Sequence, residues 1–454
     1  MLGINDKLKD LQSRGGAIRT GIVGVGQMGS SMVAQIESLD GMEVTAVANR
    51  NVNNAAKILK GIGIETSRMV LLEGANKIQD GNRTSGIIKI CGQDRKIIGR
   101  EVSKAISDGK IIVTDDIREL AGIEELDVVV DATGDPEAGA QISYSAISNQ
   151  KHMVSFNVEA DTTIGPLLKK MADNAGIVYT VAAGDEPAAA KELYDMADAL
   201  GLEVIAAGKG KNNPLERCAN PATLAGYAAR KGSSAKMMTS FVDGTKSMFE
   251  MACLSNATGL VPDVRGMHGP KVNVDELTKV YSLKGDGGIL SKKGVVEFAI
   301  GNIAPGVFLV YTSHLKIIRE ELKYLLFGDG PNYLLYRPYH LTSIEAPLSI
   351  ARAYFMGEPT IVPEAGLISE VVAYGKKDLK AGEVLDGIGG YTTYGMIELY
   401  GTAKDEDLLP LGLSGGCRLK SDIEKGQPVT YRDVELVQDS TILQLRRLQD
   451  KTHF

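Results

Sequence analysis

The sequence predicts an α/β fold that combines a Rossmann domain, a central α/β catalytic and dimerisation domain, and a small all-β module at the C-terminal end. Three observations predict this fold. Apolar strands alternate with amphipathic helices from Ala17 onward, a glycine-rich turn follows the first strand, and two similar glycine-containing patterns occur after residue 360. Alternation of strands and helices favours a parallel sheet with right-handed crossovers.

The N-terminal elements are expected in the order strand, helix, strand, helix, after a short helix within residues 1–16. The predicted strands are 17–25, 42–48, 111–116, 127–133 and 152–158, and the predicted helices are 27–39 and one that begins at Asn53. Residues 64–110 interrupt this rhythm and include a predicted hairpin at 87–99, so they are interpreted as an insertion. We therefore expect the Rossmann domain over residues 17–160.

The central domain is expected over residues 161–360. Its predicted helices begin after Ile164 and Pro187 and cross 238–259, and its predicted strands are 177–183, 202–208, 296–301 and 307–313. Residues 361–454 form the third part. There, 377–385 and 421–429 both read D-[LI]-x-x-G-x-x-[LV], which predicts short strands with glycine turns, and a helix is expected at the end.

Composition excludes several classes of protein. The chain has 454 residues, 50 of them basic and 57 acidic, so the formal charge is −7, which argues against a nucleic-acid partner. Its apolar runs are shorter than the ~20 residues of a membrane span, and the charged N-terminus resembles no secretory signal. Cys91, Cys218, Cys253 and Cys417 form no CxxC pair. We expect a cytoplasmic protein with no membrane and no disulfide framework.

A G-x-G-x-x-G pattern follows the first predicted strand and opens the first predicted helix, which is the context of a dinucleotide-binding turn. Its glycines permit a tight turn, close approach of a pyrophosphate, and helix–strand packing. The expected cofactor contacts are Gly24, Gly26, Gln27, Met28 and Gly29, with Ala132, Thr133 and Gly134 on the nicotinamide side. A glycine-rich loop that binds nothing is the structural alternative.

The end of the second strand indicates which cofactor is bound. NAD enzymes usually have a carboxylate there, whereas this chain has Asn49 and Arg50. An arginine can pair with the 2′-phosphate of NADP through two hydrogen bonds. We therefore predict NADP(H), the alternative being that Arg50 is an ordinary solvated side chain.

Polar clusters follow several predicted strands, where α/β enzymes place their sites. Carboxylates that could hold Mg²⁺ or Mn²⁺ are Glu159, Asp185 and Glu186. Candidate catalytic or phosphate-binding residues are Lys209, Lys211, Asn212, Asp243, Lys246 and His268. Each has a structural alternative: the acidic residues can stabilise helix starts, and Lys246 can be an exposed helix residue.

The order of these motifs resembles one family. A Rossmann N-terminus, GKGKNNPL (208–215), SFVDGTK (240–246), NATGLVPDVRGMHGP (256–270) and the repeated C-terminal pattern are similar to homoserine-dehydrogenase-like reductases with a C-terminal SAF (β-clip) domain. The best-known members are the DXR-like (DRL) 1-deoxy-D-xylulose 5-phosphate reductoisomerases. The resemblance implies an NADPH-dependent enzyme that isomerises a phosphorylated ketose and reduces the aldehyde intermediate to 2-C-methyl-D-erythritol 4-phosphate, in isoprenoid synthesis, with a divalent metal.

Three hypotheses about the function stay open at this point. The first is a reductase of a small phosphorylated sugar, either 1-deoxy-D-xylulose 5-phosphate or another ketose or tetrulose phosphate. The second is a homoserine-dehydrogenase-like enzyme, although the chain has Asp243-Gly244-Thr245-Lys246 where those enzymes have N-G-T-x-N-Y. The third is an NADP-binding sensor or assembly protein without turnover. A homodimer or higher homo-oligomer is expected in each case.

Overall fold

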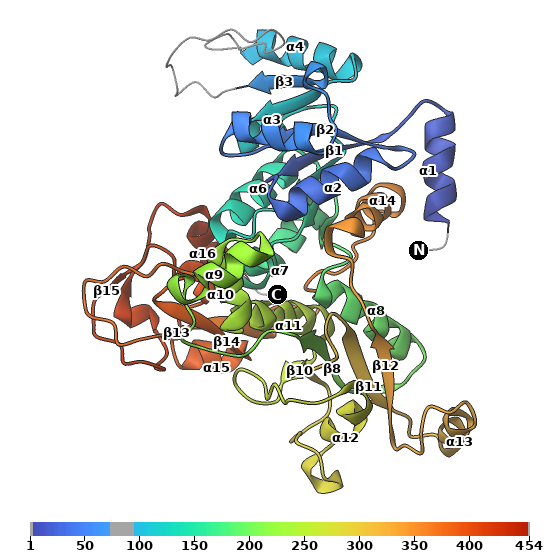
Figure 1. Ribbon diagram of the computed structural model, residues 1–454, viewed down its shortest axis with the longest axis vertical. Coiled ribbons are helices and arrows are strands. Elements are labelled where there is room, and N and C mark those ends of the chain that lie inside the picture. The colour runs from blue at the N-terminus through green and yellow to red at the C-terminus, as the bar shows by residue number, and fades with distance from the viewer. Residues whose placement is uncertain (1–2, 73–94, 453–454) are drawn as a thin grey trace. The chain divides into compact units, whose positions relative to one another are not determined.

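The computed structural model describes residues 3–72 and 95–452, and the chain divides into two compact units (Figure 1). The first unit contains residues 1–157, 167–184 and 341–360. The second contains 158–166, 185–340 and 361–454. The expected third part, 361–454, therefore belongs to the same compact unit as most of the expected central domain.

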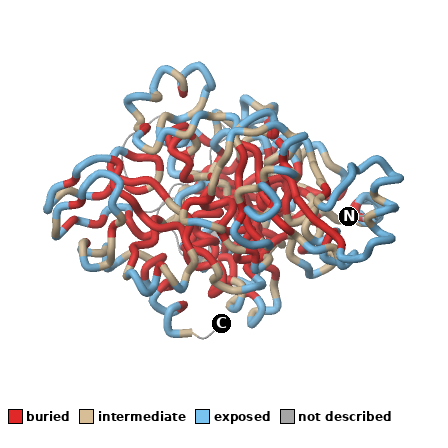
Figure 2. Tube along the Cα trace, turned by 90° about the horizontal axis from the view of Figure 1, so that it is seen from below, coloured by how far each residue is buried: buried red, intermediate tan, exposed pale blue. Residues whose placement is uncertain are grey.

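The first unit is built on a parallel sheet with the strand order β3-β4-β2-β1-β5-β6-β7. These strands consist mainly of buried residues. Figure 2 colours the trace of the chain by burial, with buried residues in red and exposed residues in pale blue. Its strands are β1 (Ile18–Val23), β2 (Met42–Ala48), β3 (Met69–Leu72), β4 (Ile111–Thr114), β5 (Val128–Asp131), β6 (His152–Ser155) and β7 (Tyr179–Val181). Its helices are α1 (Ile4–Ser13), α2 (Gln27–Glu37), α3 (Val52–Gly61), α4 (Arg95–Ser107), α5 (Ile117–Ala121), α6 (Pro136–Ser148), the later turns of α7 (Val158–Ala175), and α14 (Ala346–Met356).

The segment interpreted as an insertion, 64–110, belongs in part to the sheet itself. β3 pairs with β4 in parallel and forms the sheet's edge. The predicted hairpin at 87–99 is wrong at its described end, because α4 begins at Arg95. Residues 87–94 of that prediction lie outside the described residues. Short apolar runs such as these fit a strand or a helix equally well, so periodicity alone does not decide between them.

The second unit contains a mixed sheet with the order β12-β11-β8-β10-β9. β8 and β10 are parallel, and β11 runs antiparallel to β8. An apolar cluster packs against this sheet and includes Tyr281 and Phe308 of β11. The rings of these two residues stack with their centroids 5.2 Å apart. The unit's strands and longer helices are β8 (Glu203–Lys211), β9 (Val261–Pro262), β10 (Val295–Ile300), β11 (Val307–Thr312), β12 (Asn332–Arg337), α8 (Glu186–Ala199), α9 (Pro221–Lys231), α10 (Ala235–Val242), α11 (Thr245–Thr258), α12 (Leu277–Val280) and α13 (Lys316–Tyr324).

Strand β8 ends later than predicted, since it continues through Lys211 where a loop was expected after Gly208. The reason for the alternating glycines is contact on one face of the strand. A Cβ at Gly208 would lie 1.9 Å from the carbonyl oxygen of Glu297, and one at Gly210 would lie 2.2 Å from the nitrogen of Ala304. Side chains alternate along a strand, so Lys209 and Lys211 share the opposite face.

The single helix predicted over 238–259 is two helices, α10 and α11. Gly244 breaks them apart with a φ of +85°, and the carboxylate of Asp243 accepts a hydrogen bond from the backbone of Thr245 at 2.8 Å. A positive φ is a conformation that glycine adopts at little cost. The chain changes direction between α10 and α11, where the predicted site residues Asp243 and Lys246 lie.

The C-terminal part forms a small antiparallel arrangement in which the two repeated patterns face each other. Leu379 and Ile423 exchange backbone hydrogen bonds, and each pattern's aspartate accepts from a backbone N–H of the other: Asp378 from Lys425 and Asp422 from Ala381. The repeat in the sequence is thus a pairwise symmetry in the structure. The elements are β13 (Ser369–Gly375), β14 (Thr393–Leu399), β15 (Arg418–Leu419), β16 (Val434–Glu435), α15 (Tyr400–Asp405) and α16 (Thr441–Lys451).

Short 3₁₀ turns connect several of these elements. They are η1 (Thr66–Arg68), η2 (Val274–Glu276), η3 (Lys284–Asp286), η4 (Thr342–Ile344), η5 (Leu411–Leu413) and η6 (Tyr431–Asp433). Among the described residues, none of the helices has the length and apolar character needed to cross a membrane.

Candidate active site

The glycine-rich turn of the first unit has the geometry that its sequence predicts. Gly24 follows β1 with a φ of +90°, and Gly26 precedes the first residue of α2. A Cβ at Gly29 would lie 1.9 Å from the carbonyl oxygen of Gly24, so this position requires glycine. A Cβ at Gly26 would meet nothing within 4 Å, which leaves open space beside the N-terminus of α2. A helix N-terminus with this access suits a pyrophosphate.

The two neighbouring strand ends carry the other predicted cofactor residues. Asn49 and Arg50 follow β2, and Arg50 is exposed and makes no ion pair with any described residue. After β5, Thr133 donates to the buried carboxylate of Asp131 through both its backbone and its hydroxyl, at 2.8 and 2.6 Å. Asn157 donates to the other oxygen of Asp131 at 3.0 Å. Asp131 therefore orders the loop that contains Ala132, Thr133 and Gly134, a role the sequence did not reveal.

In the second unit, Lys209 lies at the centre of a buried charged cluster. Its ammonium contacts Glu186 of α8 at 2.6 Å and Glu250 of α11. The oxygens of Asp185, Glu186 and Glu250 lie within 4.8 Å of one another. Both Lys209 and Glu250 are almost wholly buried. Charges buried this deeply require partners, and these residues supply them to one another.

Lys246 and Glu159 extend this cluster, with 3.0 Å between the ammonium and the carboxylate. The Lys246 side chain is mostly buried. The alternative interpretation, an exposed lysine on a helix surface, does not describe it. Two carboxylate oxygens of the cluster, Asp185 Oδ2 and Glu159 Oε2, are buried without a hydrogen-bond partner among the described residues. A buried acceptor without a donor is costly, so these oxygens are suited to accept hydroxyl groups of a ligand.

The cluster separates the pKa values of its carboxylates. Burial, with the neighbouring charge of Glu186, raises the pKa of Asp185 to about 7 and that of Glu250 to about 8. Burial alone would also raise the pKa of Glu186, but Lys209 and His340 hold it well below its usual range. Near neutral pH the cluster thus contains a firm anion and two carboxyl groups that can exchange a proton. Such a separation is typical of acid–base catalysis.

Three predicted site residues lie close to this cluster without joining its ion pairs. Lys211, at the end of β8, donates to the carbonyl of Phe241, and burial together with the charge of Lys209 lowers its pKa to about 8. Asp243 forms an ion pair with Lys376 at 2.8 Å. Asn212 is exposed.

His268 has a different set of partners. Its Nδ1 lies 2.7 Å from the buried carboxylate of Glu297, and its Nε2 lies 3.6 Å from Asp263. The hydrogen bond with Glu297 raises the pKa of His268 above its usual value of 6.5, with the charges of Glu297 and Asp263 adding to it. None of its ion-pair partners belongs to the Lys209 cluster, and its catalytic role stays a prediction.

The raised pKa of His268 predicts a pH-dependent stability. Because the folded protein holds the proton more tightly than the unfolded chain, this contribution is complete below pH 6.5 and is lost as pH rises through the folded pKa. We expect His268→Gln, which keeps a neutral donor, to lower the free energy of unfolding by about 1 kcal/mol more at pH 5.5 than at pH 8.5. Denaturant unfolding of both proteins measures this, and an equal difference at the two pH values would contradict it.

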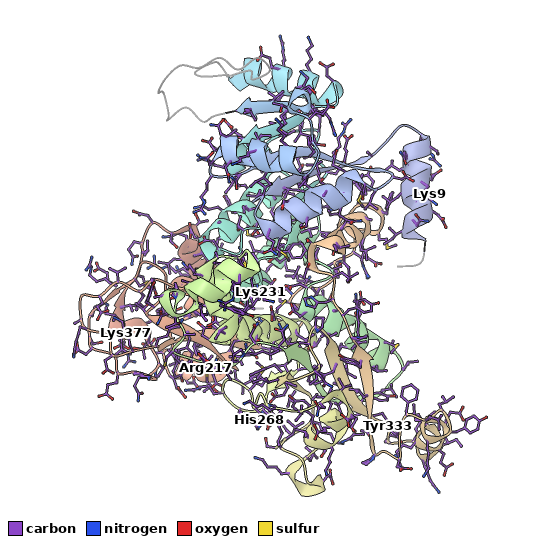
Figure 3. All side chains as sticks on the ribbon, in the orientation of Figure 1. Lys9, Arg217, Lys231, His268, Tyr333 and Lys377 are labelled. Atoms are coloured by element: carbon purple, nitrogen blue, oxygen red, sulfur yellow. The ribbon has the colours of Figure 1, made fainter. Side chains whose placement is uncertain are left out.

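Sequence reasoning missed Glu250 and Arg217. Glu250 is the only charged residue in the stretch MFEMACL, and a lone carboxylate inside an apolar helix is a signal that could have found it. Arg217 lies beyond the predicted lysine loop, in the segment between β8 and α9. Figure 3 labels Arg217 and His268 on the ribbon.

Two family models match this chain. The NAD-binding domain of homoserine dehydrogenase matches residues 24–182, and the catalytic domain of the oxidoreductase DRL matches residues 184–346. Comparison with curated protein sequences gave no match. The second match includes Asp185, Glu186, Lys209, Lys246 and Glu250, whereas Glu159 lies within the first match.

Solved structures with a similar fold have low identity. A probable dehydrogenase from Thermotoga maritima is 11% identical, with 77% of this chain and 92% of that chain covered and a TM-score of 0.42. The 1-deoxy-D-xylulose 5-phosphate reductoisomerase from Zymomonas mobilis, in complex with NADPH, is 17% identical, with 52% and 57% covered and a TM-score of 0.33.

Fold and site together define an oxidoreductase with an NAD(P)-binding Rossmann domain. More specifically, residues 24–182 are similar to the NAD-binding domain of homoserine dehydrogenase, and residues 184–346 to the catalytic domain of the oxidoreductase DRL.

Proposed function

We propose that this oxidoreductase uses NADPH to reduce a small phosphorylated ketose, and that its reaction is the 1-deoxy-D-xylulose 5-phosphate reductoisomerase reaction. The Lys209 cluster carries the proposal, because it combines a buried cation, two carboxyl groups with pKa values of about 7 and 8, and two carboxylate oxygens without donors. A polyol with a carbonyl group has complementary chemistry: hydroxyl donors for the free oxygens and a carbonyl oxygen for the ammonium.

In the proposed reaction, the Lys209 ammonium donates a hydrogen bond to the substrate carbonyl oxygen and stabilises negative charge that develops there. Asp185 Oδ2 and Glu159 Oε2 accept hydrogen bonds from substrate hydroxyls and orient them. Glu250 takes the hydroxyl proton that is lost during rearrangement of the carbon skeleton and returns it to the former carbonyl oxygen, which becomes a hydroxyl group. During reduction it passes a second proton, taken up from solvent, to the oxygen of the aldehyde intermediate. NADPH supplies the hydride and its electron pair to the aldehyde carbon.

The divalent metal ion that was also predicted stays a prediction: the oxygens of Asp185, Glu186 and Glu250, within 4.8 Å of one another, form a group that could hold one. Glu159 is engaged by Lys246, and the Lys209 ammonium lies against two of the three clustered carboxylates, Glu186 and Glu250. The cation that contacts Glu186 and Glu250 in this structure is thus Lys209. We assign polarisation of the carbonyl to Lys209 and derive no step through a metal.

The experiment that tests the proposed function follows NADPH oxidation at 340 nm with 1-deoxy-D-xylulose 5-phosphate, in EDTA and in added Mg²⁺ or Mn²⁺. We expect turnover in all three conditions and 2-C-methyl-D-erythritol 4-phosphate as product. Absence of turnover with this substrate would overturn the substrate assignment. Turnover that EDTA abolishes and Mn²⁺ restores would overturn the assignment of polarisation to Lys209.

A second candidate function is a homoserine-dehydrogenase-like reaction, which the matching NAD-binding domain favours. This substrate carries no phosphate, so a basic phosphate site would be unnecessary. NADP-dependent oxidation of homoserine, with no oxidation of NADPH by ketose phosphates, would establish this alternative.

NADPH preference is proposed from Arg50, which is exposed and has no carboxylate partner in the described part of the chain. We expect Arg50→Ala to raise the KM for NADPH about tenfold or more and to leave the KM for NADH within twofold, because only NADPH has the 2′-phosphate. Steady-state kinetics with both cofactors measure the two changes. Equal effects on both would contradict the preference.

We also propose that the protein forms a homodimer or higher homo-oligomer. Large apolar side chains around α13 are exposed, among them Tyr324 at 80% and Leu326 at 91%. Apolar groups of this size gathered on a surface commonly mark a protein interface. Light scattering coupled to size exclusion gives the mass, and a monomer at micromolar concentration would contradict the proposal.

A further inference from the structure

Two cations near the Lys209 cluster lack a carboxylate partner. Lys209, Lys246 and Lys376 each form an ion pair with at least one carboxylate. Lys211 and Arg217 form none with the residues that the structure describes, although Lys211 is only 4% exposed. Burying a positive charge without a counter-charge is costly, so a different source of negative charge is expected at this point.

Both cations lie at the C-terminal end of α10. Lys211 donates to the carbonyl of Phe241, and Nη1 of Arg217 donates to the carbonyl of Asp243 at 3.0 Å. The end of a helix offers roughly half a negative charge, which is less than the two positive charges gathered here. Burial lowers the pKa of both residues, the direction expected when counter-charge is insufficient. Donors of both side chains remain for a further acceptor.

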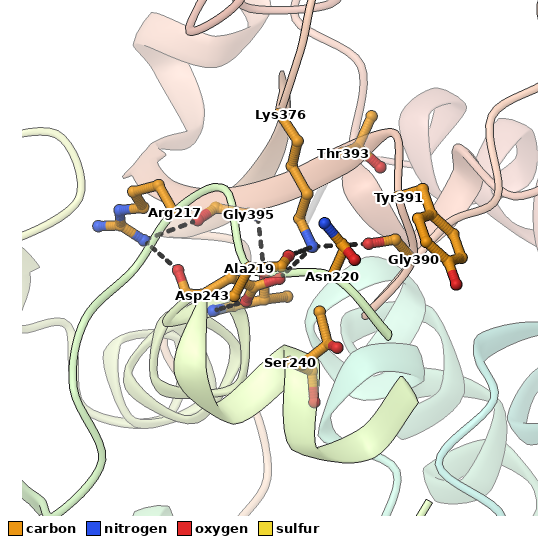
Figure 4. A network of polar contacts seen from close by, with 12 residues as sticks. Arg217, Ala219, Asn220, Ser240, Asp243, Lys376, Gly390, Tyr391, Thr393 and Gly395 are labelled. Atoms are coloured by element: carbon orange, nitrogen blue, oxygen red, sulfur yellow. Dashed lines mark hydrogen bonds and ion pairs between the residues drawn. The ribbon is translucent and has the colours of Figure 1, made fainter. Parts of the chain in front are cut away.

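The nearest carboxylate, that of Asp243, is already engaged by other groups. One of its oxygens accepts from the backbone of Thr245, and the other lies 2.8 Å from the ammonium of Lys376. Lys376 reaches this position from the segment after β13 and also donates to the carbonyls of Ala219 and Gly390, at 2.8 and 2.7 Å (Figure 4). By neutralising Asp243, Lys376 keeps the surroundings of Arg217 and Lys211 positive. Lys376 lies outside the matched catalytic domain.

The distance between Lys209 and Lys211 along β8 suits one substrate that contacts both the Lys209 cluster and the two unpaired cations. Lys209 and Lys211 are two residues apart on one face of β8, which is about 7 Å along a strand. A short sugar chain spans such a distance between its carbonyl group and a terminal phosphate. A phosphate monoester carries two negative charges and accepts paired hydrogen bonds from a guanidinium group.

We propose that Lys211 and Arg217 bind the phosphate group of the substrate, and that Lys376 is a positioning residue that keeps this site positive by neutralising Asp243. The identity of the ligand as a phosphorylated ketose rests on the proposed function, whereas the anion site rests on the contacts of the cations. A purely structural role, in which the two cations only cap α10, is the alternative.

The test compares Lys211→Met and Arg217→Met with Lys231→Met, which removes an exposed lysine at the end of α9. Binding of inorganic phosphate is measured by calorimetry, and KM and kcat are measured with 1-deoxy-D-xylulose 5-phosphate. We expect the first two variants to lose at least tenfold in phosphate affinity and to raise KM about tenfold or more, with smaller changes in kcat. The control is expected to match the wild-type protein. Lys211→Arg, which keeps the charge, should retain most of the phosphate affinity and shows whether Lys211→Met fails only by misfolding.

Lys376→Met tests the positioning role. It leaves the charge of Asp243 beside Arg217, so phosphate affinity is expected to fall about tenfold, and the double variant Lys376→Met/Asp243→Asn is expected to recover it. A structural role alone predicts no recovery of phosphate affinity in the double variant.

The outcomes separate this proposal from the proposed function. If phosphate binds and the variants abolish binding, but the ketose phosphate is not turned over, the anion site stands and the proposed reaction is wrong. If turnover occurs and both Met variants keep the wild-type KM and phosphate affinity, the reaction stands and the anion site is wrong. If the wild-type protein neither binds phosphate nor turns over the ketose phosphate, both are wrong.

Discussion

Replacing Lys209 by methionine is expected to lower kcat for the proposed substrate by about three orders of magnitude and to leave NADPH affinity within twofold. The ammonium lies between Glu186 and Glu250, and no other described cation contacts both of these carboxylates. Its removal takes away the group that stabilises negative charge on the carbonyl oxygen. It also alters the environment that separates the pKa values of the carboxylates.

The same substitution affects stability, because it leaves Glu186 and Glu250 buried without their cation. Glu250, whose pKa burial already raises to about 8, is expected to take up a proton and so limit the loss. Lys209→Arg retains a charge but places it differently, so it should keep the fold and still lose most of the activity. Thermal unfolding of both variants, with NADPH titration by fluorescence, separates the two effects. A folded Lys209→Met protein that retains more than a tenth of the wild-type kcat would show that Lys209 is not catalytic.

The parts of the fold that were predictable depend on local pattern. Apart from β3, which lies in the segment interpreted as an insertion, the strands of the first unit show as apolar runs between turns. The glycine fingerprint has a steric cause that the sequence carries by itself. A side chain at Gly29 would overlap the Gly24 carbonyl, whatever the rest of the chain does. The repeated C-terminal pattern is also local, so it was visible in the sequence. The pairing of its two copies through backbone hydrogen bonds was visible only in the structure.

The parts that could not be predicted depend on contacts between distant segments. Strand β8 continues past its apolar stretch because β10 pairs with residues 206–211 and β11 with residues 203–209, and such pairing has no signature within β8. Nothing in the sequence shows that Lys209 and Lys246 lie among the carboxylates that were predicted as metal ligands. Lys376 is 133 residues from Asp243 in the chain, so the ion pair between them is invisible before folding.

A second large effect is expected on stability, at the ion pair between Arg446 of α16 and Glu370 of β13. Both side chains are only 4% exposed. Arg446 also donates to the carbonyl of Thr163 at 3.3 Å, so it joins the C-terminal helix to the first turns of α7, which carry Glu159. Arg446→Met is expected to lower the free energy of unfolding by about 3–5 kcal/mol, because it leaves the Glu370 carboxylate buried without a partner.

The double variant Arg446→Met/Glu370→Gln identifies the cause of that loss. Removing the orphaned charge is expected to restore at least half of the stability, because an uncharged pair carries no desolvation penalty of the same size. Arg447→Met, the neighbouring position on the exposed side of α16, serves as the matched control and should change the free energy by less than about 0.5 kcal/mol. Denaturant unfolding of the four proteins at pH 7 measures these differences. If the double variant is no more stable than Arg446→Met, the loss comes from packing of the arginine side chain and its contact with Thr163, and the buried charge of Glu370 is not its cause.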